Sequence, residues 1–188
     1  MKFWTILILV FVSTHTLADL VNLDGQHAKL PPLPFQLWDK CTGEKCGGYH
    51  DGWIARDSVK LYKKRSLNSD LAFNLKKDES FEVVKLMIEV HKYGTTKVLS
   101  NTACSPFKKG NLIYEIVYVS EGFSQYWYRN TFMSCQFDDI EDINPNSATK
   151  ATARRVSQPN FSEWAKVKNS KGLLGWTNEI EKLDNQAY

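Results

Sequence analysis

Cys46, His50 and Asp51 lie close together in the sequence and carry the three groups of a cysteine nucleophile: a thiol, a base and an orienting acid. Such a constellation is assembled in space, so nearness along the chain is weak evidence for it. In an exported chain Cys46 is expected to be oxidised, and no Gly-x-Ser-x-Gly motif offers a serine nucleophile. We therefore expect no catalytic residues and no enzyme, and a cysteine cell-wall hydrolase is the least favoured alternative.

Metal-binding patterns are incomplete. Asp142-x-Asn144-x-Asn146 resembles the first half of a calcium loop, but Ser147 stands where that loop needs glycine and Ala153 where it needs a bidentate glutamate. No His-Glu-x-x-His motif or paired-histidine spacing is available for zinc. The sequence predicts neither a metal nor a cofactor.

The chain has four cysteines, an even number, which in an exported protein favours disulfides. Of the three possible pairings we favour Cys41 with Cys46 and Cys104 with Cys135. The second pair would close a loop that contributes roughly 3 to 4 kcal/mol. A four-cysteine zinc site is the alternative, but neither pair has Cys-x2-Cys spacing.

Aromatic residues form the best candidate ligand surface. Tyrosine, tryptophan and arginine dominate recognition surfaces because they offer rigid area with a polar end. They also fill the cores of small β-proteins, and alternate residues of a strand face opposite sides. The candidate ligand-binding residues are Tyr126, Trp127, Tyr128, Arg129, Trp164 and Trp176.

The N-terminus predicts export. Met1-Lys2, an apolar run from Phe3 and the small residues before position 19 match a cleaved signal peptide, with the cut after Ala18. The apolar run is shorter than the roughly 20 residues that span a bilayer, so we expect no stable membrane span after cleavage and a periplasmic or secreted location; an uncleaved anchor is the alternative. Loss of Lys2 leaves 23 basic against 21 acidic residues. That balance does not indicate a nucleic-acid partner.

Strand patterns dominate the rest of the chain. Residues 19–50 are predicted to be an extended, proline-containing lead-in that carries the Cys41/Cys46 loop. From residue 51, apolar and polar residues alternate in hairpins with period two. In residues 81–91 this places Val84, Leu86, Ile88 and Val90 on one face and Lys85, Glu89 and His91 on the other. The polar stretch 144–160 is expected to be a loop with room for a short helix over 148–156.

The last hairpin is the clearest local pattern. Trp164 to Val167 forms a first run, Asn169 to Gly172 supplies turn residues, and Leu173 to Thr177 returns. Glycine at the turn accepts a positive φ. Two tryptophans give this short segment a large apolar area.

These segments resemble the bacterial SH3-like domains of exported envelope proteins. The similarity rests on Val59-Lys-Leu-Tyr, Leu75-Lys-Lys-Asp-Glu with Phe81-Glu-Val-Val, and above all Trp164-x-x-Val followed by Gly172-x-x-Gly-Trp. The resemblance implies an all-β fold with SH3-like barrels over residues 51–188, in halves 53–90 and 160–180. Residues 91–159 would be inserted hairpins and a loop in one barrel, or part of a second, intertwined barrel.

The resemblance also implies a function. Such domains bind peptides or cell-wall material, so we expect a non-enzymatic binding or scaffold module whose partner is a peptide, a cell-wall component or an envelope protein. The alternative is an inhibitor of an exported hydrolase that presents Lys108-Lys109-Gly110 or the 144–160 stretch. If the two halves form one barrel, Trp164 and Trp176 must lie with the first strands rather than with residues 112–132.

Overall fold

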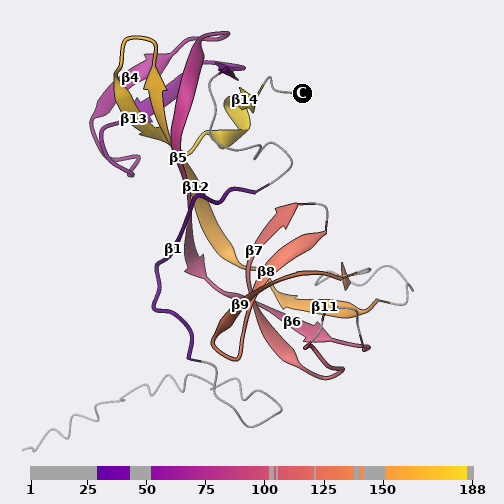
Figure 1. Cartoon of the computed structure of the whole chain (residues 1–188). Coiled ribbons are helices and arrows are strands. Elements are labelled where there is room, and N and C mark those ends of the chain that lie inside the picture. Colours follow the sequence, from indigo (N-terminus) through magenta and orange to yellow (C-terminus); the bar gives the residue numbers. More distant parts are fainter. Residues whose placement is uncertain are drawn as a thin grey trace, which may run out of the picture.

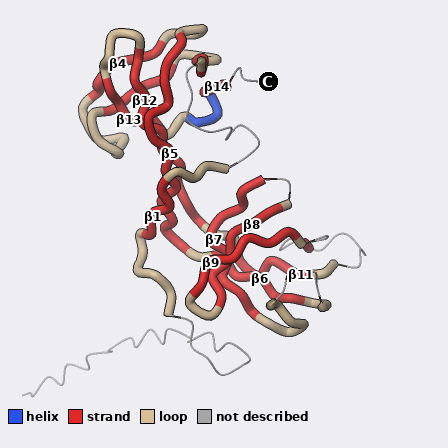
Figure 2. Tube along the Cα trace, in the orientation of Figure 1, coloured by secondary structure: helices blue, strands red, loops and turns tan. Residues whose placement is uncertain are grey.

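The computed structural model describes residues 29–42, 52–101, 104, 106–120, 122–137, 140–141 and 151–185. The predicted signal peptide, the group of Cys46, His50 and Asp51, and the incomplete calcium loop up to Ser147 lie outside these residues. The described part is all-β, and its one helical element is the short 3-10 helix η1 (Ile180–Lys182), which Figure 2 shows beside β14.

The described residues form two sheets, and Figure 1 shows them as two lobes joined by long strands. The sheet of the first lobe has the strand order β14-β2-β5-β12-β13-β3-β4, with β1 paired to β5 as well. Its strands are β1 (Phe35–Trp38), β2 (Trp53–Ala55), β3 (Val59–Tyr62), β4 (Leu71–Leu75), β5 (Ser80–Lys92), β12 (Asn160–Asn169), β13 (Leu174–Thr177) and β14 (Leu183–Asn185).

The sheet of the second lobe has the order β10-β11-β6-β7-β8-β9. Its strands are β6 (Gly94–Val98), β7 (Leu112–Ser120), β8 (Phe123–Tyr128), β9 (Thr131–Gln136), β10 (Ile140–Glu141) and β11 (Ala153–Ser157). β11 corrects the expected helix over 148–156, because its five residues pair with β6 instead. Ala153 and Arg155 face one side of the sheet, and a register shift after Arg155 places Ser157 opposite Thr95, whose hydroxyl is hydrogen-bonded to that of Ser157.

The closing hairpin lies with the first strands. β12 pairs with β5 along its whole length, and Trp176 of β13 lies opposite Tyr62 of β3. Gly172 has the expected positive φ, 79°, and Asn169 Oδ1 accepts hydrogen bonds from the backbone N–H groups of Lys171 and Leu173. Segments 53–92 and 160–185 therefore share one sheet, and the chain between them forms the other.

A β-bulge in β5 changes which residues face the core. Opposite β12, Lys166 pairs with Lys85 but Val167 pairs with Val83, so Val84 is the extra residue. Val83 and Leu86 both point into the core of the first lobe, whereas Val84 is exposed. The predicted placement of Val84 beside Leu86 is wrong because period two holds only on each side of a bulge.

Among the described residues, three groups of buried side chains hold the fold together. The first fills the curled sheet of the first lobe, around Leu61, Val83 and Val167. The second fills the second lobe, around Phe107, Tyr126 and Tyr128. The third joins the lobes, where Ile88 and Val90 of β5 pack with Ile116 and Val117 of β7.

The proline-containing lead-in takes part in the third group. Leu30, Phe35 and Leu37 pack against it, and the Tyr93 hydroxyl donates a hydrogen bond to the Pro31 carbonyl over 2.8 Å. Burial raises the pKa of the Tyr93 phenol to about 12. The last residues of the lead-in form a strand, β1, which the sequence did not predict because prolines precede it.

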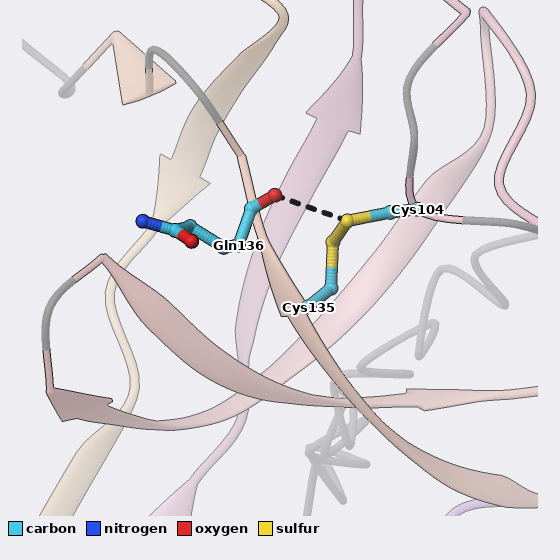
Figure 3. Close-up of a disulfide and its surroundings, with 3 residues drawn as sticks. All are labelled: Cys104, Cys135 and Gln136. Carbon is cyan, nitrogen blue, oxygen red and sulfur yellow. Dashed lines mark hydrogen bonds between the residues drawn. A yellow bond between two sulfur atoms is a disulfide. The ribbon is translucent and has the colours of Figure 1, made fainter.

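The disulfide between Cys104 and Cys135 confirms the favoured pairing, with a Cα–Cα distance of 5.8 Å. It ties the loop after β6 to β9, and Cys104 Sγ lies 3.1 Å from the carbonyl oxygen of Gln136 (Figure 3). The same loop inserts Phe107 into the core of the second lobe. Cys41 is also disulfide-bonded, and Cys46, its expected partner, lies outside the described residues.

Candidate functional site

The six predicted ligand-binding residues lie in two separate places. Tyr126, Trp127, Tyr128 and Arg129 belong to the second lobe, on β8 and the turn after it, whereas the two tryptophans at 164 and 176 belong to the first lobe. The structure does not bring the two groups onto one surface.

Residues on β8 are largely used for packing. Tyr126 and Tyr128 are buried, each making an edge contact with the Phe107 ring at 5.9 and 5.2 Å. Trp127 points to the other side, as the alternation of a strand predicts, and meets Phe132 edge-on at 4.6 Å. Phe132 in turn stacks on Phe35, so the lead-in contributes to covering this cluster.

Arg129 remains exposed. It lies in the turn between β8 and β9 with a positive φ of 49°, and its guanidinium is 5.1 Å from the Tyr128 ring. No second exposed aromatic side chain of the predicted set lies next to it, because its neighbours Trp127 and Tyr128 face the two cores. At this end of the predicted surface, an exposed arginine lies over the ring of a buried tyrosine.

The second lobe also buries an ion pair. The fully buried Glu115 accepts two hydrogen bonds from Arg155, over 2.8 and 2.9 Å, and further ones from Thr96 and Ser124. Burial, and next the negative charge of Glu115, raise the pKa of the neighbouring Tyr126 phenol, which therefore stays neutral. Both carboxylate oxygens have partners, so this network holds β6, β7, β8 and β11 together.

The outer face of the first sheet carries a different arrangement. Ala165 and Val167 of β12 point into the core. Successive residues of a strand face opposite sides, so Trp164, before Ala165, and Lys166, between the two, point outward. Strand register then places two rows of side chains side by side on that face. One row is Trp38, Met87 and Trp164; the other is Lys85, Lys166, Trp176 and Tyr62.

Arg65, from the loop after β3, lies across these rows. Its guanidinium carbon is 5.2 Å from the centre of the Trp38 ring and 5.7 Å from that of Trp176. It also contacts Met87 Sδ and lies 3.5 Å from Glu89 Oε2. Arg65 is therefore fixed by contacts on several sides.

Two lysines complete the arrangement. Lys85 Nζ lies 4.4 Å from the centre of the Trp38 ring, and Lys166 Nζ lies 5.8 Å from that of Trp176. Across β1, β5, β12 and β13, two neighbouring lysines thus lie between two indole rings. We call this surface the Arg65 face; its residues are Trp38, Arg65, Lys85, Lys166 and Trp176.

The Arg65 face is accessible and suited to binding. Trp38 is 41% exposed, and two apolar residues of the same sheet, Val84 next to Lys85 in the chain and Leu174 two residues before Trp176, are 39% and 47% exposed. Trp164, by contrast, is buried, with 7% exposure. Cations held on aromatic rings recognise anionic and planar groups.

Sequence reasoning found Trp176 and the outward direction of Lys85, but not Trp38 or Arg65. Trp38 follows three prolines and carries no strand signal of its own. Arg65 reads as the end of a charged turn, Lys63-Lys64-Arg65. Only the pairing of β1 with β5 brings the two side chains together.

Within the described ranges, no group of three or more His, Cys, Asp or Glu side chains is placed to hold a metal ion. None of the described helical segments is long and apolar enough to cross a membrane. Comparisons of this chain with protein-family models, with curated proteins and with solved structures find no match.

Proposed function

We propose that this protein is a non-enzymatic binding module, exported to the bacterial envelope, that holds a peptide segment of a partner protein on the Arg65 face. The observation that supports this most is the position of the Arg65 guanidinium between the rings of Trp38 and Trp176. Arginine and tryptophan are the side chains most enriched among energetically dominant interface residues. The proposed surface is thus on the first sheet, away from Trp127.

Preorganisation is a further support. Arg65 is held by Glu89 and Met87, and Gln36 Nε2 donates to the same Glu89 carboxylate over 3.2 Å. A long side chain that is already fixed loses less conformational entropy when a ligand binds. A partner therefore gains contact area at little ordering cost.

As part of this proposal, the first lobe is an SH3-like domain. That assignment is supported by the sheet that joins segments 53–92 and 160–185, and by the hairpin of β12 and β13 that completes it. The second lobe is then an insertion into that domain. Export is supported by the pattern of residues 1–18 and by the Cys104–Cys135 disulfide, which suits an oxidising compartment.

Capture from an envelope extract tests the proposal. Immobilised wild-type protein is compared with Trp38→Ala and Arg65→Ala, and with two matched controls on the second lobe, Tyr118→Ala and Arg129→Ala. We expect the captured partner to be lost with the first two variants and kept with the controls. Equal capture by all variants, each shown to melt cooperatively, would contradict the proposal.

Two further measurements test the alternatives, which are binding of cell-wall material and inhibition of an exported hydrolase. Sedimentation with isolated cell-wall polymer shows whether the ligand is wall material rather than peptide. An inhibitor would use the exposed turn at Lys108 and Lys109, so Lys109→Ala would then abolish capture while Trp38→Ala would not. The binding-module proposal expects the reverse.

A further inference from the structure

Lys85 and Lys166 lie directly opposite each other on β5 and β12, on the same face of the sheet. Like charges in this relation destabilise a sheet, because the side chains of opposite residues are close. Neighbouring pairs on β5 and β12 do not place like charges opposite each other. Beyond the inward-facing pair of Val83 and Val167, Glu82 and Lys168 form a salt bridge of 2.8 Å.

Nothing described in the structure neutralises the two lysines. Each ammonium lies over an indole ring, which attracts a cation without removing its charge. Glu89, the carboxylate that contacts Arg65, is engaged by Arg65 and Gln36. Among the described residues, neither Lys85 nor Lys166 forms an ion pair with a carboxylate.

From this we infer that the lysine pair is an anion subsite, and that the ligand of the Arg65 face is an acidic peptide whose carboxylate bridges Lys85 and Lys166. The inference rests on the proposed function and specifies its ligand. A bridging carboxylate converts the repulsion between the two ammonium groups into two attractive contacts. The paired lysines thus oppose folding slightly and favour binding, as functional sites often do.

The surroundings favour a peptide over a phosphate-bearing polymer. Val84 lies next to Lys85 in the chain, Leu174 lies opposite Lys168, and both are exposed. An anion subsite with apolar neighbours matches a chain in which acidic and apolar side chains alternate. Polyphosphate and phosphodiester backbones have no apolar side chains to place there.

The probe is a synthetic peptide of Glu-Leu-Glu-Ser repeats, titrated against the purified protein while tryptophan fluorescence is recorded. Its Gln-Leu-Gln-Ser counterpart is the ligand control. We expect saturable binding of the acidic peptide that weakens with added salt, and binding of the neutral peptide that is at least roughly tenfold weaker. Equal binding of the two peptides would overturn the inference.

A charge reversal separates function from folding. Lys85→Glu places a carboxylate opposite Lys166, so a cross-strand ion pair can form within the protein itself. We expect this variant to melt at or above the wild-type temperature while its affinity for the acidic peptide falls more than roughly tenfold. Lys168→Gln, which removes the neighbouring ion-paired lysine, is the control and is expected to bind like wild type.

The outcomes distinguish this inference from the proposed function. If Lys85→Glu binds the acidic peptide like wild type while Trp38→Ala captures no partner, the lysine subsite is wrong and the binding module stands. If Trp38→Ala captures its partner normally, the Arg65 face itself is wrong. Polyphosphate that binds more tightly than the acidic peptide at equal ionic strength would overturn the choice of a peptide.

Discussion

Phe35 of β1 stacks on Phe132 of β9, with ring centres 5.4 Å apart and planes at 25°. The second lobe therefore holds the strand whose last residue is Trp38. Backbone pairing of Trp38 with Met87 continues this attachment into the first lobe. An aromatic contact between the two lobes thus helps to position a residue of the Arg65 face.

Phe132→Ala should weaken ligand binding at a distance. The variant loses two aromatic pairs, with Phe35 and with Trp127, each worth about 0.5 to 1.5 kcal/mol. We expect faster amide hydrogen exchange in β1 and a several-fold lower affinity for the acidic peptide. Tyr118→Ala, which removes another exposed aromatic side chain of the second lobe, is the control. Wild-type affinity in Phe132→Ala would show that β1 holds Trp38 without help from β9.

The buried ion pair of the second lobe should dominate its stability. Arg155→Ala leaves the fully buried Glu115 without its counter-charge, which costs roughly 3 to 5 kcal/mol. Urea unfolding measures the change. Lys168→Ala breaks the exposed pair with Glu82 and should cost at most about 1 kcal/mol. Similar losses in the two variants would mean that Glu115 is solvated.

The sequence predicted the β-hairpin of Trp164 to Trp176 well, because its turn chemistry is local: an asparagine that caps the turn and a glycine with positive φ. It did not predict the position of Val84, because a bulge is decided by the pairing of two strands about 80 residues apart. The Arg65 face was missed for a similar reason. Trp38 and Arg65 meet only after β1 and β3 have joined the same sheet.

Glu163 should make stability depend on pH. Its carboxylate accepts a hydrogen bond from the Thr42 N–H, and burial raises its pKa above the ordinary 4.5. The folded state then holds this proton more tightly than the unfolded state, so the free energy of unfolding should fall as the pH rises above about 4.5.

Glu163→Gln keeps an oxygen that can accept the Thr42 hydrogen bond and removes the titration. Urea unfolding from pH 4 to pH 7 should show the variant more stable than wild type near neutral pH, with the two curves meeting at the acid end. Glu82→Gln, a change at a surface carboxylate, is the control. A constant difference between Glu163→Gln and wild type across this range would exclude Glu163 as the source.

The Cys104–Cys135 disulfide should stabilise the second lobe. It links residues 31 positions apart, and a loop of that size corresponds to roughly 3 to 4 kcal/mol on the chain-entropy model. Cys104→Ser with Cys135→Ser should lower the urea midpoint accordingly. Unchanged stability would mean that the loop carrying Phe107 is held by packing alone.

The indole N–H signals of the tryptophans test the central claim most directly, in proton–nitrogen NMR spectra of labelled protein recorded while the acidic peptide is added. If the Arg65 face binds the peptide, the signals of Trp38 and Trp176 shift in a saturable way. Those of Trp53 and Trp127, which lie in packed clusters of the two lobes, stay in place. A shift of the Trp127 signal while those of Trp38 and Trp176 remain unchanged would contradict the account.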